Sequence, residues 1–311
     1  MIFKPVERAL VHKARDGEVL IANLTRVGNA RYTALVPAPT HHELFGDNPR
    51  PCLDPVFLVE AFRQTGYAVA HQFENVPLDF QFILKELQLA RAPSNNSART
   101  DSIGTDDPAL LTFDISESRF RDGALSGFSA VSDYRIGGET SQSLAAAVSF
   151  YAPPIYQRIR WSKEDFQQGR VVLTSSASSV RACDVGRGKP SNVLIDNIAH
   201  REEGHSFAEA MLPENHPYFL DHPIDHLPGV FHFEATHQMA LAMALYWRGL
   251  TPSQVNIKWM KGDFDRFANV DQPLKLDAQI SQQGDTDMAV NCLLSQANEV
   301  ARIGLQLFIA G

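Results

Sequence analysis

The sequence is poor in cysteine and carries no concentrated positive charge. Its 311 residues include three cysteines, Cys52, Cys183 and Cys292, which lie far apart and form no CxxC pair. This excludes a disulfide framework and a structural zinc site, and it favours a reducing, cytoplasmic compartment. The formal net charge is −8, and no run of Lys or Arg is longer than a pair. Nucleic acid is therefore not an expected partner.

Long apolar runs are also absent. No stretch approaches the roughly 18 apolar residues of a membrane helix, and the first residues lack the basic start and apolar core of a signal peptide. We therefore expect no membrane association. The hydrophobic fraction of 44% and the charged fraction of 21% are ordinary for a folded protein. The length suggests about two domains of roughly 150 residues each.

An internal repeat divides the chain. When the sequence is shifted by 174 residues, positions 18–72 align with positions 192–246 without a gap, and 18 of the 55 aligned positions are identical. The chain is therefore interpreted as two copies of one domain. We place the copies at residues 1–158 and 159–311.

Each copy contains a Pro-rich loop followed by a long apolar stretch. The loops, at 46–55 and 220–229, are not expected to continue a strand or a helix, because proline breaks both. The apolar stretches, at about 56–72 and 230–247, have helical spacing and are apolar on nearly every face, which predicts two buried central helices.

Strand-like segments surround each predicted helix. In the first copy they are expected at 19–21, 32–36, 81–89, 109–116 and 144–151. In the second copy they are expected at 193–195, 207–211, 254–258, 274–280, 289–294 and 301–309. The connection at 152–180 is expected to be an exposed crossing segment, and 91–107 a polar insertion. This order predicts an α+β domain in which an antiparallel sheet wraps around one buried helix.

Several motifs carry a resemblance to a known family. The second copy contains DHPIDHLPGVFHFEATHQ at 221–238, which is similar to the active-site segment of hotdog-fold 3-hydroxyacyl-ACP dehydratases. A nearer resemblance is to the A-factor biosynthesis (AfsA) family of double-hotdog proteins. It rests on LVHKARDGEVLI at 10–21, LDPVFLVEAFRQ at 53–64, VPLDFQF at 76–82, VGR at 185–187 and DHPIDHLPG at 221–229. The implied fold is a tandem hotdog.

The resemblance implies an activity and its reactants. Such proteins are acyltransferases that join a 3-oxoacyl group from acyl carrier protein to the hydroxyl of dihydroxyacetone phosphate, on the way to γ-butyrolactone, butenolide or furan signalling molecules. The phosphopantetheine arrives on the carrier protein, so no further cofactor is expected. The family usually has Arg at the fourth position of the E-A-x-R-Q stretch in both copies, whereas this chain has Arg63 and His237 there. The identity of the acceptor is therefore open.

The resemblance also implies a composite site. In the dehydratases the histidine comes from one hotdog domain and the acid from the helix of its partner. By this resemblance His222 and Gly229 of the second copy would act with Glu60 of the first. At the equivalent positions of the first copy stand Asn48 and Pro55, and proline has no N–H to offer an oxyanion. We therefore expect one working site in each chain.

The residue types suggest roles for the three catalytic candidates. Glu60 lies in an apolar helix, where burial is expected to raise its pKa and make it a base. Gly229 precedes the helix, so its N–H or that of Val230 can polarise a thioester carbonyl. His222 could share the work of the base or orient the thioester.

Six further residues are candidates for substrate binding. Arg63 could contact a phosphate or the phosphopantetheine, and Gln64 could fix either the Glu60 carboxylate or the substrate. The other candidates are Glu234, His237, Gln238 and His226. His42 and His216 are expected to fix their loops instead. No metal site is expected, because the histidines of the 221–229 loop have no partners at ligand spacing.

Other functions remain open at this point. A dehydratase, a hydratase or a thioesterase would use the same acyl tunnel without a polar pocket for a phosphorylated acceptor. A non-catalytic acyl-binding module would keep the tunnel and lose the chemistry. The sequence leaves the acyl chain length and the presence of a homodimer undetermined.

Overall fold

The computed structural model describes residues 3–48, 53–92, 108–136, 139–161, 172–175 and 178–309. The chain forms two compact units. Unit 1 comprises residues 1–40 and 57–169, and unit 2 comprises residues 41–56 and 170–311. The Pro-rich loop of the first copy therefore packs with the second copy. Cys52 and most of the expected 91–107 insertion lie outside the described residues.

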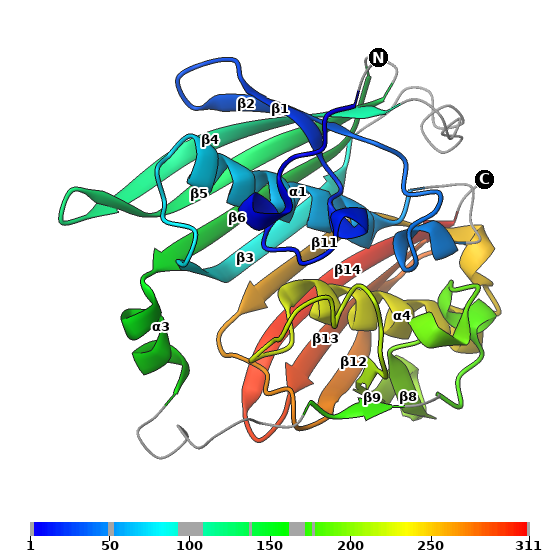
Figure 1. Ribbon diagram of the computed structural model, residues 1–311. Coiled ribbons are helices and arrows are strands. Elements are labelled where there is room, and N and C mark those ends of the chain that lie inside the picture. Colours follow the sequence, from blue (N-terminus) through cyan, green and yellow to red (C-terminus); the bar gives the residue numbers. More distant parts are fainter. Residues whose placement is uncertain are drawn as a thin grey trace. The chain divides into compact units, whose positions relative to one another are not determined.

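Unit 1 is an antiparallel sheet against one long helix, α1 (Pro55–Gln72) (Figure 1). Its described strands run in the spatial order β1-β2-β4-β5-β6-β3. They are β1 (Ala22–Arg26), β2 (Arg31–Val36), β3 (Gln81–Arg91), β4 (Ala109–Arg121), β5 (Ala124–Ile136) and β6 (Glu139–Tyr151). The helix packs on the sheet through rings such as Phe62, whose centroid lies 5.3 Å from that of Phe113 in β4. Gly66 lies beside the same ring.

Unit 2 repeats this arrangement around α4 (Gly229–Arg248) (Figure 1). Its described strands run in the order β8-β9-β12-β13-β14-β11, which matches the order in unit 1 strand for strand. They are β8 (Ile195–His200), β9 (His205–Ala210), β11 (Val255–Phe264), β12 (Leu274–Gln283), β13 (Asp287–Ser295) and β14 (Glu299–Ile309). A separate parallel pair joins β7 (Thr174–Ser175) to β10 (Leu212–Pro213).

Short 3-10 helices complete each unit. In unit 1, η1 (Arg8–Val11) and η2 (Asp16–Glu18) precede the first strand, and in unit 2, η4 (Ala182–Val185) and η5 (Pro190–Asn192) stand in the same order. The others are η3 (Phe45–Asp47), η6 (Glu202–Gly204) and η7 (Pro252–Gln254). The repeat therefore extends in structure to segments before residue 18, where the sequence copies diverge.

The expected α+β fold and the two buried central helices are confirmed. Every residue from Val230 to Ala244 in α4 is buried, in keeping with its apolar character on all faces. No helix in the described part of the chain is long and apolar enough to span a membrane.

Two strand predictions were wrong, and the structure adds a helix to the connection that was expected to be exposed. The first strand of each copy begins later than expected, because the backbone N–H groups of Leu20 and Leu194 bond to glutamine side chains instead of a strand neighbour. Strand β5 was not expected, since its sequence ALSGFSAVSDYRI is rich in Ser, Gly and Ala rather than β-branched residues. The 152–180 connection contains a helix, α3 (Pro153–Arg160), with Pro in its first turn and Tyr156 buried.

Candidate active site

A buried glutamine ties the N-terminal segment of each unit to its central helix. In unit 1 the Gln64 Oε1 accepts from the Leu20 N–H at 2.8 Å, and Nε2 donates to the Glu18 carbonyl at 2.8 Å. Nε2 also donates to Glu60 Oε1 at 2.8 Å. Gln64 therefore fixes the carboxylate, one of the two roles expected for it, while substrate contact stays a prediction.

Gln238 makes the same set of bonds in unit 2. Its Oε1 accepts from the Leu194 N–H at 2.8 Å, and its Nε2 donates to the Asn192 carbonyl at 2.7 Å and to Glu234 Oε1 at 2.5 Å. Both glutamines are fully buried. In both copies, therefore, a buried glutamine orients the glutamate of the central helix.

Two cations converge on Glu60 in unit 1. Arg63 donates from Nε to Oε2 at 2.6 Å and from Nη2 to Oε1 at 2.7 Å. Lys13, which follows η1, places Nζ 3.5 Å from Oε1. The side chains of Glu60 and Lys13 are almost completely buried, whereas that of Arg63 is 25% exposed. The Arg63 guanidinium lies 4.6 Å from the centroid of the Tyr67 ring.

The predicted raised pKa of Glu60 is wrong. Burial does raise the pKa of this carboxyl, but the charges of Arg63 and Lys13 and the hydrogen bonds from Arg63 and Gln64 outweigh burial. Together they lower the pKa to about 2. Glu60 is therefore an ionised anchor for two cations across the ordinary pH range, and a weak proton acceptor.

In unit 2 a single buried arginine bridges two carboxylates. Arg187 donates from Nε to Glu234 Oε1 at 2.8 Å and from Nη2 to Oε2. Its Nη1 lies 2.7 Å from Asp54 Oδ2 and donates to the Leu44 carbonyl at 3.0 Å. All three charged side chains are at most 1% exposed.

These charges set the protonation states of the unit 2 cluster. Burial raises the pKa of Glu234, but Arg187 and His237 outweigh it and lower that pKa to about 2. Burial lowers the pKa of Arg187, but the two carboxylates outweigh burial and raise it. Glu234 is therefore ionised and Arg187 stays protonated.

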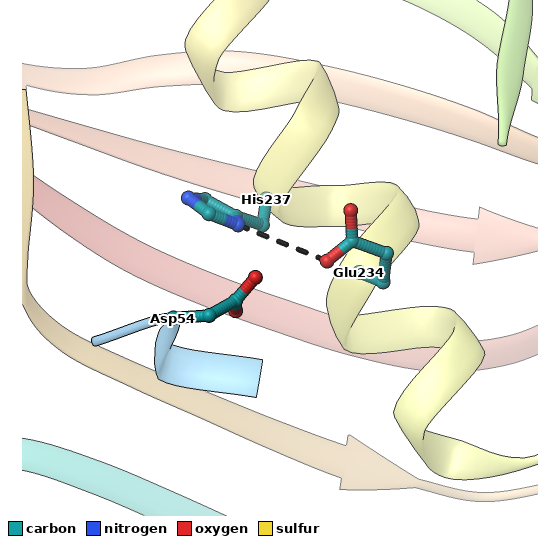
Figure 2. A group of neighbouring side chains, drawn as sticks. All are labelled: Asp54, Glu234 and His237. Carbon is teal, nitrogen blue, oxygen red and sulfur yellow. Dashed lines mark ion pairs between the residues drawn. The ribbon is translucent and has the colours of Figure 1, made fainter. Parts of the chain in front are cut away.

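Asp54, Glu234 and His237 form a compact group of metal-ligand types (Figure 2). Their ligand atoms lie within 4.8 Å of one another, and His237 Nδ1 is 3.9 Å from Glu234 Oε2. The guanidinium of Arg187 already pairs with both carboxylates, however. A divalent cation would have to displace a buried, hydrogen-bonded arginine, so the donor set does not fit a resident metal.

The loop before α4 supplies the remaining predicted residues. His222 is 40% exposed, with Nδ1 3.5 Å from Asp221 Oδ2. His226 Nδ1 lies 2.6 Å from Asp225 Oδ1, and its ring packs on Phe267. His226 is therefore held against the loop, and its role toward substrate stays a prediction.

Gly229 is the first residue of α4, which begins one residue earlier than predicted. The Pro228 carbonyl accepts from the N–H groups of Phe231 and His232 at 2.9 and 3.4 Å. Within the described residues, neither Gly229 N–H nor Val230 N–H donates to another backbone group. Two donors therefore stand at the positive end of a 20-residue helix, the arrangement that an oxyanion needs.

The expected loop-fixing roles of two histidines are confirmed. His42 Nδ1 accepts from the N–H groups of Leu44 and Phe45, both at 3.2 Å. His216 Nδ1 makes the equivalent contacts with Tyr218 and Phe219 at 3.2 and 3.3 Å. Each imidazole thus supplies the hydrogen-bond acceptor for two backbone N–H groups of a tight turn.

Three charged residues of these clusters were missed from the sequence: Lys13, Arg187 and Asp54. The first two had a signal, because Lys13 and Arg187 are related by the 174-residue shift and each follows a buried Val by two positions. No signal in the sequence identified Asp54, because its partner Arg187 lies in the other copy of the repeat.

The architecture and the paired clusters define a tandem hotdog protein built on two central-helix glutamates. A sequence model of the A-factor biosynthesis hotdog domain matches residues 2–146 and 171–302. The chain belongs to this A-factor biosynthesis family.

Named relatives agree with this assignment, and a solved structure agrees with the fold. The chain is 27% identical to a 2-oxo-3-(phosphooxy)propyl 3-oxoalkanoate synthase of Streptomyces virginiae over 292 residues, covering 92% of each chain. It is 24% identical to the synthase of that name from Streptomyces griseus, covering 92% of this chain and 89% of the relative. The fold is similar to that of the dehydratase domain of RzxB from Pseudomonas fluorescens, with a TM-score of 0.53, 11% identity, and coverage of 93% and 98%.

Proposed function

We propose that this chain transfers a 3-oxoacyl group from acyl carrier protein to the hydroxyl of dihydroxyacetone phosphate. The product is a phosphorylated 3-oxoacyl ester, a precursor of γ-butyrolactone, butenolide or furan signalling molecules. The names of the Streptomyces relatives describe such an ester. The phosphopantetheine of the carrier protein brings the thioester, so the proposal requires no other cofactor.

The observation that carries the choice of acceptor is the pair of cations that converge on Glu60. In unit 1 two cations, Lys13 and Arg63, face one carboxylate. In unit 2 one cation, Arg187, faces two carboxylates, Asp54 and Glu234. The partly exposed guanidinium of Arg63 suits a phosphate dianion, because planar Arg donors match phosphate oxygens. We therefore assign the acceptor phosphate to Arg63, with Lys13 in support.

The thioester is assigned to the start of α4. Its carbonyl oxygen would accept from the N–H groups of Gly229 and Val230 and gain negative charge as the hydroxyl attacks. His222, exposed on the preceding loop, would orient the carbonyl. The hydroxyl oxygen forms a new bond to the acyl carbon, the C–S bond breaks, and the sulfur leaves as the carrier protein thiol after taking a proton.

The remaining candidates take supporting roles in this proposal. Glu60 and Gln64 hold the two cations in place, while Glu234, His237 and Gln238 maintain the unit 2 cluster. The carrier protein is the macromolecular partner that this proposal requires. We also propose cytoplasmic action, for which the free thiols of Cys183 and Cys292 give support.

The test compares acceptors. Release of carrier protein thiol from a 3-oxoacyl carrier protein is followed with dihydroxyacetone phosphate, dihydroxyacetone, or no acceptor. The proposal expects fast release only with the phosphorylated acceptor. Equal release under all three conditions means that water is the second reactant and that the protein is a thioesterase. No release under any condition favours an acyl-binding module.

A further inference from the structure

A buried histidine with one unpartnered ring nitrogen lies at the start of α4. His232 is 2% exposed, and its Nδ1 lies 2.8 Å from the carbonyl oxygen of Pro228, the residue that precedes the helix. Within the described part of the chain, the His232 Nε2 atom is buried and has no hydrogen-bond partner. The N–H groups of Gly229 and Val230 belong to the same first turn. One turn of one helix in unit 2 therefore carries this imidazole and both proposed oxyanion donors.

The hydrogen bond to Pro228 determines where the imidazole proton lies. A carbonyl oxygen can only accept, so the His232 Nδ1 carries the proton. Burial is the main cause that lowers the pKa of His232 from 6.5 to about 4, and His226 adds a smaller contribution. The ring is therefore neutral near pH 7, and its Nε2 bears a lone pair.

A lone pair that is buried without a donor destabilises the folded chain. The groups beside the His232 ring are aromatic: the centroids of Phe264 and Phe231 lie 5.7 and 6.3 Å from its own. The first copy avoids this cost, because the equivalent residue is Leu58, which is also buried. The lone pair of His232 therefore suits a donor that a ligand brings.

The two copies of the repeat differ at this helix start in a consistent way. Gly229 and His232 of the second copy stand where the first copy has Pro55 and Leu58. Proline has no N–H for a carbonyl oxygen, and leucine has no lone pair for a hydroxyl. The copy that presents an N–H donor to the thioester is thus the copy that presents the buried acceptor. This coincidence links His232 to the reaction assigned to the start of α4.

From this geometry we propose that His232 is the base of the transfer: its Nε2 accepts the hydrogen bond of the acceptor hydroxyl and then takes its proton. The inference rests on the proposed function and uses residues of unit 2 alone. As the hydroxyl oxygen bonds to the acyl carbon, its proton moves to Nε2, and the thioester oxygen becomes an oxyanion at the Gly229 and Val230 N–H groups. As the C–S bond breaks, the imidazolium gives that proton to the departing thiolate, and neutral His232 is restored.

His232 differs from Glu60 in the availability of its acceptor atom. Both Glu60 oxygens accept hydrogen bonds from Arg63, and one also accepts from Gln64, so a hydroxyl would have to displace a charged donor. No described residue occupies the His232 Nε2. Burial disfavours the imidazolium in the resting protein, but the oxyanion that forms at the same helix turn supplies a counter-charge and favours it during transfer.

The first test measures whether His232 recognises the acceptor hydroxyl. Calorimetry compares the binding of dihydroxyacetone phosphate with that of hydroxyacetone phosphate, which lacks this hydroxyl, with the thiol form of the carrier protein present. His232→Leu should weaken binding of dihydroxyacetone phosphate about 2- to 13-fold, the loss of one neutral hydrogen bond. Binding of hydroxyacetone phosphate should not change. An equal effect on both ligands would overturn the inference.

The second test measures ester formation. His232→Leu is expected to lower kcat/KM about 100- to 10,000-fold, the usual contribution of a general base. His232→Gln, whose amide oxygen accepts a hydrogen bond but holds no proton near pH 7, should restore the binding of dihydroxyacetone phosphate and leave kcat low. The control is His205→Gln, a partly exposed histidine of unit 2, which should keep the wild-type kcat. A folded His232→Leu variant with wild-type kcat/KM would overturn the inference and mean that Nε2 holds a structural water only.

The failure of the proposed function is distinguishable from the failure of this inference. If the wild type forms no ester but hydrolyses the thioester, the proposed acceptor is wrong. The inference then stands only if His232→Leu loses hydrolysis to the same extent, with water as the attacking hydroxyl. If the wild type does neither, both are wrong.

Discussion

Lys13 and Arg187 occupy equivalent positions in the two copies, and each directs its cationic group at the central-helix glutamate of its own unit. The Lys13 Nζ lies 3.5 Å from Glu60, and the Arg187 Nε lies 2.8 Å from Glu234. Equivalent backbone positions in the two copies thus hold different sets of charged side chains. In unit 1 the glutamate also pairs with Arg63, whereas in unit 2 the arginine also pairs with Asp54. This asymmetry underlies the assignment of the phosphate to unit 1.

The oxyanion role of Gly229 predicts a difference between two substitutions. Gly229→Pro removes the N–H but suits the first position of a helix, where the first copy has Pro55. We expect it to lower kcat about 100- to 1,000-fold, the cost of one lost oxyanion donor, with little change in melting temperature. Gly229→Ala keeps the N–H and should retain most activity. Equal kcat in the two variants would remove Gly229 N–H from the mechanism.

The phosphate role of Arg63 predicts an acceptor-specific defect. Arg63→His introduces the residue that the second copy has at this position, His237. Loss of a charge-assisted bond worth about 1.5–3 kcal/mol should raise KM for dihydroxyacetone phosphate about 10- to 100-fold. The KM for unphosphorylated dihydroxyacetone should hardly change, since it makes no phosphate contact. A similar rise for both acceptors would show that Arg63 acts only through Glu60.

The buried bridge of Arg187 predicts a large loss of stability. Arg187→Leu leaves Asp54 and Glu234 without their counter-charge, which should lower the free energy of unfolding by about 3–5 kcal/mol in urea titrations. Arg187→Lys, which copies Lys13, should cost less. The control is Lys189→Met, because its partly exposed pair with Glu43 is expected to contribute at most about 1 kcal/mol.

The same variant tests the metal assignment. Zn²⁺ should leave the melting temperature of the wild type unchanged, because the Arg187 guanidinium already occupies the carboxylates. In Arg187→Leu the group of Asp54, Glu234 and His237 loses that competitor, and Zn²⁺ should raise the melting temperature. Stabilisation of the wild type by Zn²⁺, reversed by EDTA, would contradict the assignment.

Acid should destabilise the protein in two stages. Burial lowers the pKa of His232 from 6.5 to about 4, so its contribution is present above pH 6.5 and is lost as the pH falls toward 4. His216 has a pKa of about 4 as well. Glu60 and Glu234, with pKa values lowered from 4.5 to about 2, lose their contributions between those values.

The substitution His232→Leu isolates the contribution of one buried histidine to the first stage of acid destabilisation. The first copy has Leu58 at this position, so the core should accept the leucine. When the pH is lowered from 6.5 to 4, the free energy of unfolding should fall less in His232→Leu than in the wild type. The difference should reach about 3 kcal/mol at pH 4. Chemical unfolding at several pH values measures this. Parallel curves for the two proteins would contradict the buried, neutral state of His232.

The sequence predicted the parts of this molecule that depend on local pattern. The apolar stretches located both central helices, and the 174-residue shift identified the repeat and the glutamates within it. The pKa of Glu60 was predicted in the wrong direction, because burial was visible in the sequence and the neutralising cations were not assigned. Lys13 lay 47 residues away, in a segment quoted for its resemblance alone. Asp54 contributes to the cluster of the other copy, which only the folded chain reveals.

The most direct test of the account is mass spectrometry of the products formed from a 3-oxoacyl carrier protein and dihydroxyacetone phosphate. The account predicts a phosphorylated 3-oxoacyl ester together with free carrier protein thiol, and strongly reduced ester with Arg63→His. Free 3-oxo acid as the product in the presence of the acceptor, or an unchanged thioester, would contradict it.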